Sequence, residues 1–133
     1  MITVVDVETS WQVTDTGGYD PSPYHPDNIL VSVGINDEYY FTNHSERIDD
    51  GCYHKIQSIL DKTTLLVGHN IKFDLMWLIE AGFKYTGKVY DTMLGEYILN
   101  RGIRKSLTLE MSCRRRRIGS KDNRIKEFTD RGI

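Results

Sequence analysis

Residues 2–8, with the sequence ITVVDVE, decide the fold of this chain. The stretch alternates and is rich in valine, which predicts a β-strand. Because successive strand residues point to opposite faces, Asp6 and Glu8 share a face with Ile2 and Val4. Two carboxylates that project together at a strand end repel each other, and a hard cation such as Mg²⁺ compensates that repulsion best. The pair indicates a metal site or, alternatively, two solvated charges at the end of a strand.

Outward from this strand, the pattern predicts alternating strands and helices. Residues 17–28 contain all three prolines and predict a long surface loop. Further strands are expected at residues 29–35, 38–42, 65–68 and 89–90, and helices at residues 52–61, 71–81, 91–98 and from residue 106 onward. Strands first, then strands alternating with helices, indicate one α/β domain over residues 1–133, with a mixed central sheet flanked by helices.

A second polar cluster lies where a buried strand gives way to a helix. Asn70, Phe73 and Asp74 are spaced i, i+3 and i+4 and therefore share one helical face. A stripe that faces only the core would not normally contain an amide and a carboxylate. The face is a candidate functional site; the alternative is that Asn70 caps the helix and Asp74 faces solvent. Asp91, at the next junction of strand and helix, is expected to be a structural N-cap.

Charge is distributed unevenly along the chain. Residues 1–100 hold 6 Lys and Arg against 15 Asp and Glu, whereas residues 101–133 hold 11 against 4. An acidic body with a basic tail suits a protein that collects metal ions in one place and contacts phosphates in another. Arg101, Arg104 and Lys105 begin the basic tail and are candidate nucleic-acid-binding residues. A solvated, Arg-rich surface helix is the alternative.

The composition is that of an ordinary globular domain, 39% hydrophobic and 27% charged. No apolar run approaches the ~20 residues that span a membrane, and no basic segment precedes the first apolar run. We therefore expect a protein without a membrane partner. Its expected location is the cytoplasm, or the host cytoplasm if a phage encodes it.

Three blocks carry a resemblance to a known family, and they appear in the family's order. They are residues 5–9 (VDVET), residues 68–74 (GHNIKFD) and residues 90–100 (YDTMLGEYILN). Together they resemble the 3′→5′ proofreading exonuclease domains of family A, polymerase I type, DNA polymerases, which belong to the DEDD exonuclease superfamily. The stretch at residues 22–28 (SPYHPDN) looks like a loop of phage members.

The resemblance implies a ribonuclease H-like fold and removal of nucleotides from the 3′ end of single-stranded DNA by two-metal-ion hydrolysis. Asp6, Glu8 and Asp74 would be the catalytic residues and the ligands of Mg²⁺ or Mn²⁺. Thr9 and Asn70 would contact the terminal nucleotide. In the full-length protein the partner would be a polymerase domain serving DNA replication.

The sequence also departs from the family. The fourth carboxylate of the family follows a Tyr by four residues or a His by five, in a later motif. No His follows His69, and the residue four after Tyr97 is Arg101. We expect a C-terminally truncated domain that is weak or inactive alone, with exposed surface that a homodimer contact could cover.

Two other functions share these motifs. A ribonuclease D-like enzyme that acts on RNA 3′ ends would contain nearly the same residues, and the polymerase-like block at residues 91–100 argues against it. A non-catalytic nucleic-acid-binding module is the other alternative, and the three intact acidic positions argue against that one.

Overall fold

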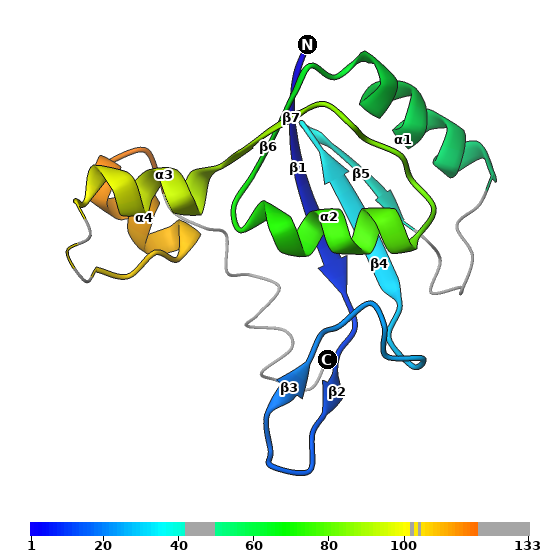
Figure 1. The fold of residues 1–133 in the computed structure, drawn as a ribbon, viewed down its shortest axis with the longest axis horizontal. Coiled ribbons are helices and arrows are strands. Elements are labelled where there is room, and N and C mark those ends of the chain that lie inside the picture. Colours follow the sequence, from blue (N-terminus) through cyan, green and yellow to red (C-terminus); the bar gives the residue numbers. More distant parts are fainter. Residues whose placement is uncertain (42–49, 102, 104, 120–133) are drawn as a thin grey trace. The chain divides into compact units, whose positions relative to one another are not determined.

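The chain forms two compact units, Met1–Thr92 and Met93–Ile133, in a computed structural model that describes residues 1–41, 50–101, 103 and 105–119 (Figure 1). The first unit contains β1 (Ile2–Thr9), β2 (Gln12–Val13), β3 (Tyr19–Asp20), β4 (Leu30–Ile35), β5 (Glu38–Phe41), α1 (Asp50–Lys62), β6 (Leu65–Gly68), α2 (Ile71–Glu80) and β7 (Lys88–Asp91). The helices α3 (Thr92–Leu99) and α4 (Leu109–Arg116) follow. Within the described residues, none of the helices is long and apolar enough to cross a membrane.

The first unit is built on a five-stranded sheet with the order β5-β4-β1-β6-β7. β1 pairs antiparallel with β4 and parallel with β6, β4 pairs antiparallel with β5, and β6 pairs parallel with β7. Helices α1 and α2 connect successive strands. The sheet is therefore mixed and flanked by helices, and the expected α/β, ribonuclease H-like fold is confirmed.

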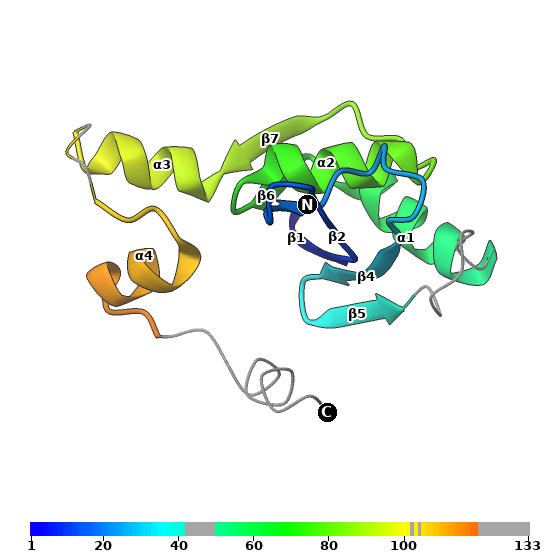
Figure 2. The same ribbon diagram turned by 90° about the horizontal axis from the view of Figure 1, so that it is seen from below.

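One face of the sheet is covered by α1 and α2. Along β1 the buried residues alternate with exposed ones, as a strand with one covered face requires. Val5 and Val7 pair with Ile35 and Val33 of β4, and all four are buried. They join one hydrophobic cluster with Ile56 and Leu60 of α1 and with Ile71, Trp77 and Leu78 of α2. Figures 1 and 2 show α2 lying across β1 on this face.

The opposite face, called the outer face here, carries exposed apolar side chains. Ile2 and Val4 of β1 are 64% and 51% exposed. On β5, Tyr39 lies level with Asp6 across the β4 residue Gly34, and Phe41 lies level with Glu8 across Ser32. Both aromatic side chains are exposed. Asp6 and Glu8 also belong to this face by alternation, so the outer face combines apolar residues with two carboxylates.

Two local predictions from the sequence are wrong. The stretch at residues 17–28 was expected to be loop throughout, but Tyr19–Asp20 forms β3 and pairs with Gln12–Val13 as a small hairpin. The last helix was expected to begin at Ser106, but it begins at Leu109, because Thr108 is the N-cap and its hydroxyl accepts the N–H of Met111. The other expected strands and helices are present, with bounds that differ by no more than two residues.

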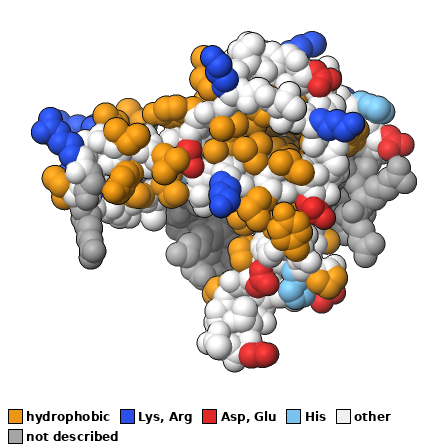
Figure 3. Space-filling view, in the orientation of Figure 1, with side chains coloured by type: hydrophobic (Ala, Val, Ile, Leu, Met, Phe, Trp, Pro, Cys, Tyr) orange, Lys and Arg blue, Asp and Glu red, His pale blue; other side chains and the backbone are white. Residues whose placement is uncertain are grey.

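The second unit places charge inside and apolar side chains outside. Glu96 is buried between α3 and α4, whereas Leu94, Ile98 and Leu99 of α3 are each more than half exposed. Hydrophobic side chains are accordingly visible over the α3 and α4 part of the surface in Figure 3. Among the described residues of this unit, the ion pairs of Glu96 with Arg115 and Arg116 join α3 to α4.

Candidate active site

The site lies where β1 runs past the end of β6. β6 pairs with the first part of β1, from Ile2 to Val4, whereas β4 pairs with the second part, from Val5 to Thr9. The second part of β1 therefore has strand pairing on its β4 side. Asp6 and Glu8 stand on either side of Val7 in this part, and both are exposed on the outer face.

The turn that follows β6 brings α2 back against this part of β1. Gly68 is the last residue of β6, and a Cβ there would lie 3.2 Å from the carbonyl oxygen of Val5 and 3.1 Å from Ile71. A larger residue there would make the neighbouring atoms give by a few tenths of an ångström, so glycine lets the turn lie close to β1. Asn70 follows in the left-handed region, with φ 58° and ψ 51°, and α2 begins at Ile71.

Asp74 of α2 bonds directly to β1. Its Oδ1 accepts the N–H of Val7 at 3.2 Å, and its side chain is buried. The bond lies in the plane of the sheet, on the side of β1 away from β4. Asp74 therefore contacts β1 at Val7, between Asp6 and Glu8, although the side chains of Asp6 and Glu8 point to the outer face.

Burial dominates the electrostatics of this carboxyl and raises the pKa of Asp74 to about 7. The hydrogen bond from Val7 opposes that shift, whereas the charges of Asp6, Asp91 and Glu8 add to it. The carboxylates of Asp6, Asp91 and Glu8 are therefore close enough to disfavour a negative charge on Asp74. A positive charge placed among them would remove that penalty.

Asp91 and Thr92 tie the end of β7 to the turn before α2. Oδ1 of Asp91 accepts the backbone N–H of Asn70 at 2.9 Å, and Oγ1 of Thr92 lies 2.8 Å from Nδ1 of His69. The Thr92 hydroxyl also donates to the carbonyl oxygen of Gly68 at 3.3 Å. These bonds were not expected from the sequence. The position of Asp91 between β7 and α3 was foreseen, but its bond to Asn70 depends on the parallel pairing of β6 with β7.

The remaining site residues are spread around the same strand ends. Thr9 is half-buried at the end of β1, next to an irregularity in the pairing between Glu8 and Thr9. Asn70 is exposed, and Phe73 packs against the hydrophobic core. The carboxyl ends of the parallel strands β1, β6 and β7 thus carry Asp6, Glu8, Thr9, His69, Asn70, Asp74, Asp91 and Thr92. The carboxyl ends of parallel strands are where α/β sheets place ligands.

The donor set suits a divalent cation by its chemistry. Asp6, Glu8 and Asp74 offer carboxylate oxygens, which hard cations prefer, and their mutual repulsion favours a bound positive charge. Among the residues that the structure describes, no three His, Cys, Asp or Glu side chains converge closely enough to form a metal-ligand group. The three carboxylates therefore have the charge and the oxygen donors that a divalent ion requires, but their side chains do not surround one position in the described part of the structure.

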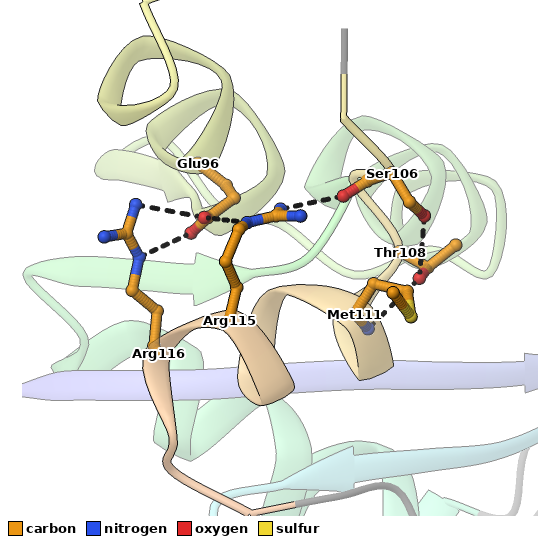
Figure 4. Close-up of polar contacts among 6 residues, drawn as sticks. All are labelled: Glu96, Ser106, Thr108, Met111, Arg115 and Arg116. Atoms are coloured by element: carbon orange, nitrogen blue, oxygen red, sulfur yellow. Dashed lines mark hydrogen bonds and ion pairs between the residues drawn. The ribbon is translucent and has the colours of Figure 1, made fainter. Parts of the chain in front are cut away.

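The basic residues fall into two groups. Arg101, in the left-handed region after α3 with φ 55°, and Lys105 are exposed, whereas Arg104 lies outside the described residues. Arg114 binds Glu110 at 2.8 Å. Arg115 and Arg116 both bind Glu96, at 3.1 and 3.0 Å (Figure 4). These bonds, first of all the one from Arg116, hold the pKa of Glu96 below its usual value. The arginines of α4 are therefore engaged in structural ion pairs.

Comparison with known proteins gives one match. A family model described as 3′-5′ exonuclease matches residues 14–110, which is more than half of the chain. No curated protein matches the chain. The matched range contains Asn70, Asp74 and Asp91, whereas β1 with Asp6 and Glu8 precedes it.

Proposed function

Since the chain belongs to the 3′-5′ exonuclease domain family of family A DNA polymerases, we propose that it removes nucleotides from the 3′ end of single-stranded DNA in proofreading. Family membership implies a hydrolase with a nucleic-acid substrate. The observation that best supports the site is the bond from Val7 to Asp74, because it brings the α2 carboxylate to the strand that carries Asp6 and Glu8. The proposed active site is this end of β1.

We assign Asp6, Glu8 and Asp74 as the residues that would hold Mg²⁺ or Mn²⁺. Bound there, two divalent ions would activate a water and stabilise the leaving 3′ oxygen. The protein's own contribution is to gather negative charge beside a strand end and to hold Asp74 in place through the Val7 N–H. Thr9, the last residue of β1, and Asn70, just before α2, are assigned to the terminal nucleotide.

An excess of the chain over substrate is expected to shorten single-stranded DNA slowly from its 3′ end in Mg²⁺, and not in EDTA. Asp6→Ala should abolish the shortening, because it removes one of the three carboxylates. Asp15→Ala, which changes an exposed acid outside the proposed site, is the matched control. The products are resolved on a gel with DNA and RNA oligonucleotides side by side. Faster shortening of RNA would favour the ribonuclease D-like alternative, and binding without any Mg²⁺-dependent shortening would favour the non-catalytic module.

We assign Arg101, Arg104 and Lys105 to the phosphates of the strand. The ion pairs of Arg114, Arg115 and Arg116 support this choice, because those cations are already neutralised. Replacing all three assigned residues with Ala is expected to weaken binding and to lower the slope of log affinity against log salt by about 2, since each contact to a single strand contributes roughly 0.7. Fluorescence anisotropy in a salt series measures the slope, with Lys62→Ala of α1 as control. An unchanged slope would refute the assignment.

We further propose that the domain works beside a polymerase domain. We also propose a homodimer contact through the exposed Tyr39 and Phe41 of β5, the edge strand that lies two strands away from β1.

A further inference from the structure

Two adjacent residues at the end of β7 bond to two adjacent residues before α2. Asp91 accepts the N–H of Asn70, and the Thr92 hydroxyl contacts Nδ1 of His69. Because the same hydroxyl donates to the Gly68 carbonyl, it accepts from His69 when Nδ1 carries the proton. We call these three bonds the β7 clasp.

The clasp bonds to a residue that breaks the chain direction between β6 and α2. Asn70 has a left-handed backbone, which Asn adopts more readily than most residues with a side chain. Its carbonyl oxygen accepts the N–H of Phe73 at 3.1 Å, so the conformation of Asn70 also sets the first turn of α2. That turn ends at Asp74, whose Oδ1 bonds to Val7.

We propose that Asp91 and Thr92 are positioning residues that hold Asn70 and the start of α2 in register with β1, so that the 3′-terminal nucleotide meets a preformed turn. This inference rests on the proposed function, since it takes that end of β1 as the nucleotide site. Asp91 acts through its hydrogen bond to Asn70, and its charge is secondary. Thr92 acts through its hydroxyl, and its methyl group is secondary.

Matched substitutions separate these roles. Asp91→Ala removes the acceptor, whereas Asp91→Asn keeps an acceptor oxygen and removes the charge. Thr92→Val removes the hydroxyl at constant shape, whereas Thr92→Ser keeps the hydroxyl. Thr86→Val, at an exposed threonine before β7, is the control for the loss of a hydroxyl.

The first measurement reports on the clasp directly. Amide hydrogen exchange at Asn70, followed by NMR, should be about ten-fold faster in Asp91→Ala, because the loss of one hydrogen bond has up to about that effect. Asp91→Asn should stay close to the parent chain. Faster exchange spread evenly over β1, β6 and α2 would show general loosening of the fold and would contradict a local clasp.

The second measurement reports on nucleotide positioning without metal or cleavage. Affinities are compared in EDTA for two oligonucleotides that differ only in a free 3′ hydroxyl or a 3′ phosphate. The parent chain should prefer the free end, and Asp91→Ala and Thr92→Val should lose about ten-fold of that preference. Asp91→Asn, Thr92→Ser and Thr86→Val should keep it, and melting temperatures identify any variant that fails to fold.

The outcomes distinguish the two proposals. A parent chain with no preference for a free 3′ end would count against the proposed function, and the clasp proposal would fall with it. A parent preference that persists in Asp91→Ala and Thr92→Val would overturn the clasp proposal alone. An equal loss in Asp91→Asn and Asp91→Ala would also overturn it, because charge and not the hydrogen bond would then be the determinant.

Discussion

Asp74→Asn is expected to make the folded chain more stable at about pH 8, by about 2 kcal/mol, while it removes the proposed cleavage activity. The folded pKa of Asp74 is about 7, against an ordinary value of 3.8. Between these values the unfolded chain releases the proton and the folded chain keeps it. Stability therefore falls as pH rises from about 4 to about 7 and is constant above. A shift of about 3 units corresponds to ~4 kcal/mol, and relaxation of the surroundings around the buried charge reduces that figure.

Asparagine reproduces the protonated carboxyl without its titration and keeps an oxygen that accepts the Val7 N–H. The variant and the parent chain should therefore be equally stable near pH 4 and differ above pH 7. Urea unfolding across this pH range measures the difference, with Asp61→Asn of α1 as the exposed control. A variant that is less stable than the parent chain at pH 8 would show that the charged carboxylate stabilises the fold. That result would contradict the interpretation that burying the charge of Asp74 destabilises it.

Residues 1–133 by themselves are expected to bind single-stranded DNA but to cleave it on the order of 100-fold more slowly than a chain with a fourth carboxylate. Asp6, Glu8 and Asp74 supply three carboxylates, and the resemblance implies four around two ions. With fewer ligands the site offsets less positive charge, and Mg²⁺ keeps its waters unless the ligand geometry is close to octahedral. The family's Tyr or His that positions the attacking water is also absent from these residues.

A chimera tests this expectation. A segment with Tyr-x-x-x-Asp from a related domain is joined after Ile133, and single-turnover cleavage in Mg²⁺ is compared with that of residues 1–133. The same chimera with its Asp changed to Asn is the control and should cleave as slowly as the original chain. Rapid 3′→5′ degradation by residues 1–133, abolished by Asp6→Ala, would show that the fourth carboxylate is dispensable.

Much of the fold follows from local patterns. The alternation in residues 2–8 predicts β1 and the face of Asp6 and Glu8, because strand periodicity depends on neighbouring residues alone. The strand at residues 65–68 is predicted to the residue. The small hairpin of β2 and β3 has two-residue strands that are too short to show a period. The start of α4 was misplaced because Ser106 and Thr108 are both good N-caps, and only the structure shows which one bonds.

The site is less predictable than the fold because it depends on register. Nothing in the sequence relates Val7 to Asp74, since their bond requires β1 to extend past β6 and α2 to return toward it. The bond from Asp91 to Asn70 likewise needs the register in which Gly68 pairs with Asp91. The assignments of Asp6, Glu8 and Asp74 to metal, and of Thr9 and Asn70 to the nucleotide, stay predictions.

The central place of β1 has a consequence for the order of folding. Ile2 pairs with Leu65, so the pairing of β1 with β6 joins residues that are synthesised 63 positions apart. At typical rates of translation the wait is about 3 to 13 s, and such non-local pairing is slow to form. During that time β1 is an apolar strand with an unfilled edge, which is prone to pair with other chains. Asp6 and Glu8 interrupt its apolar alternation, and charges at such positions oppose aggregation of nascent strands.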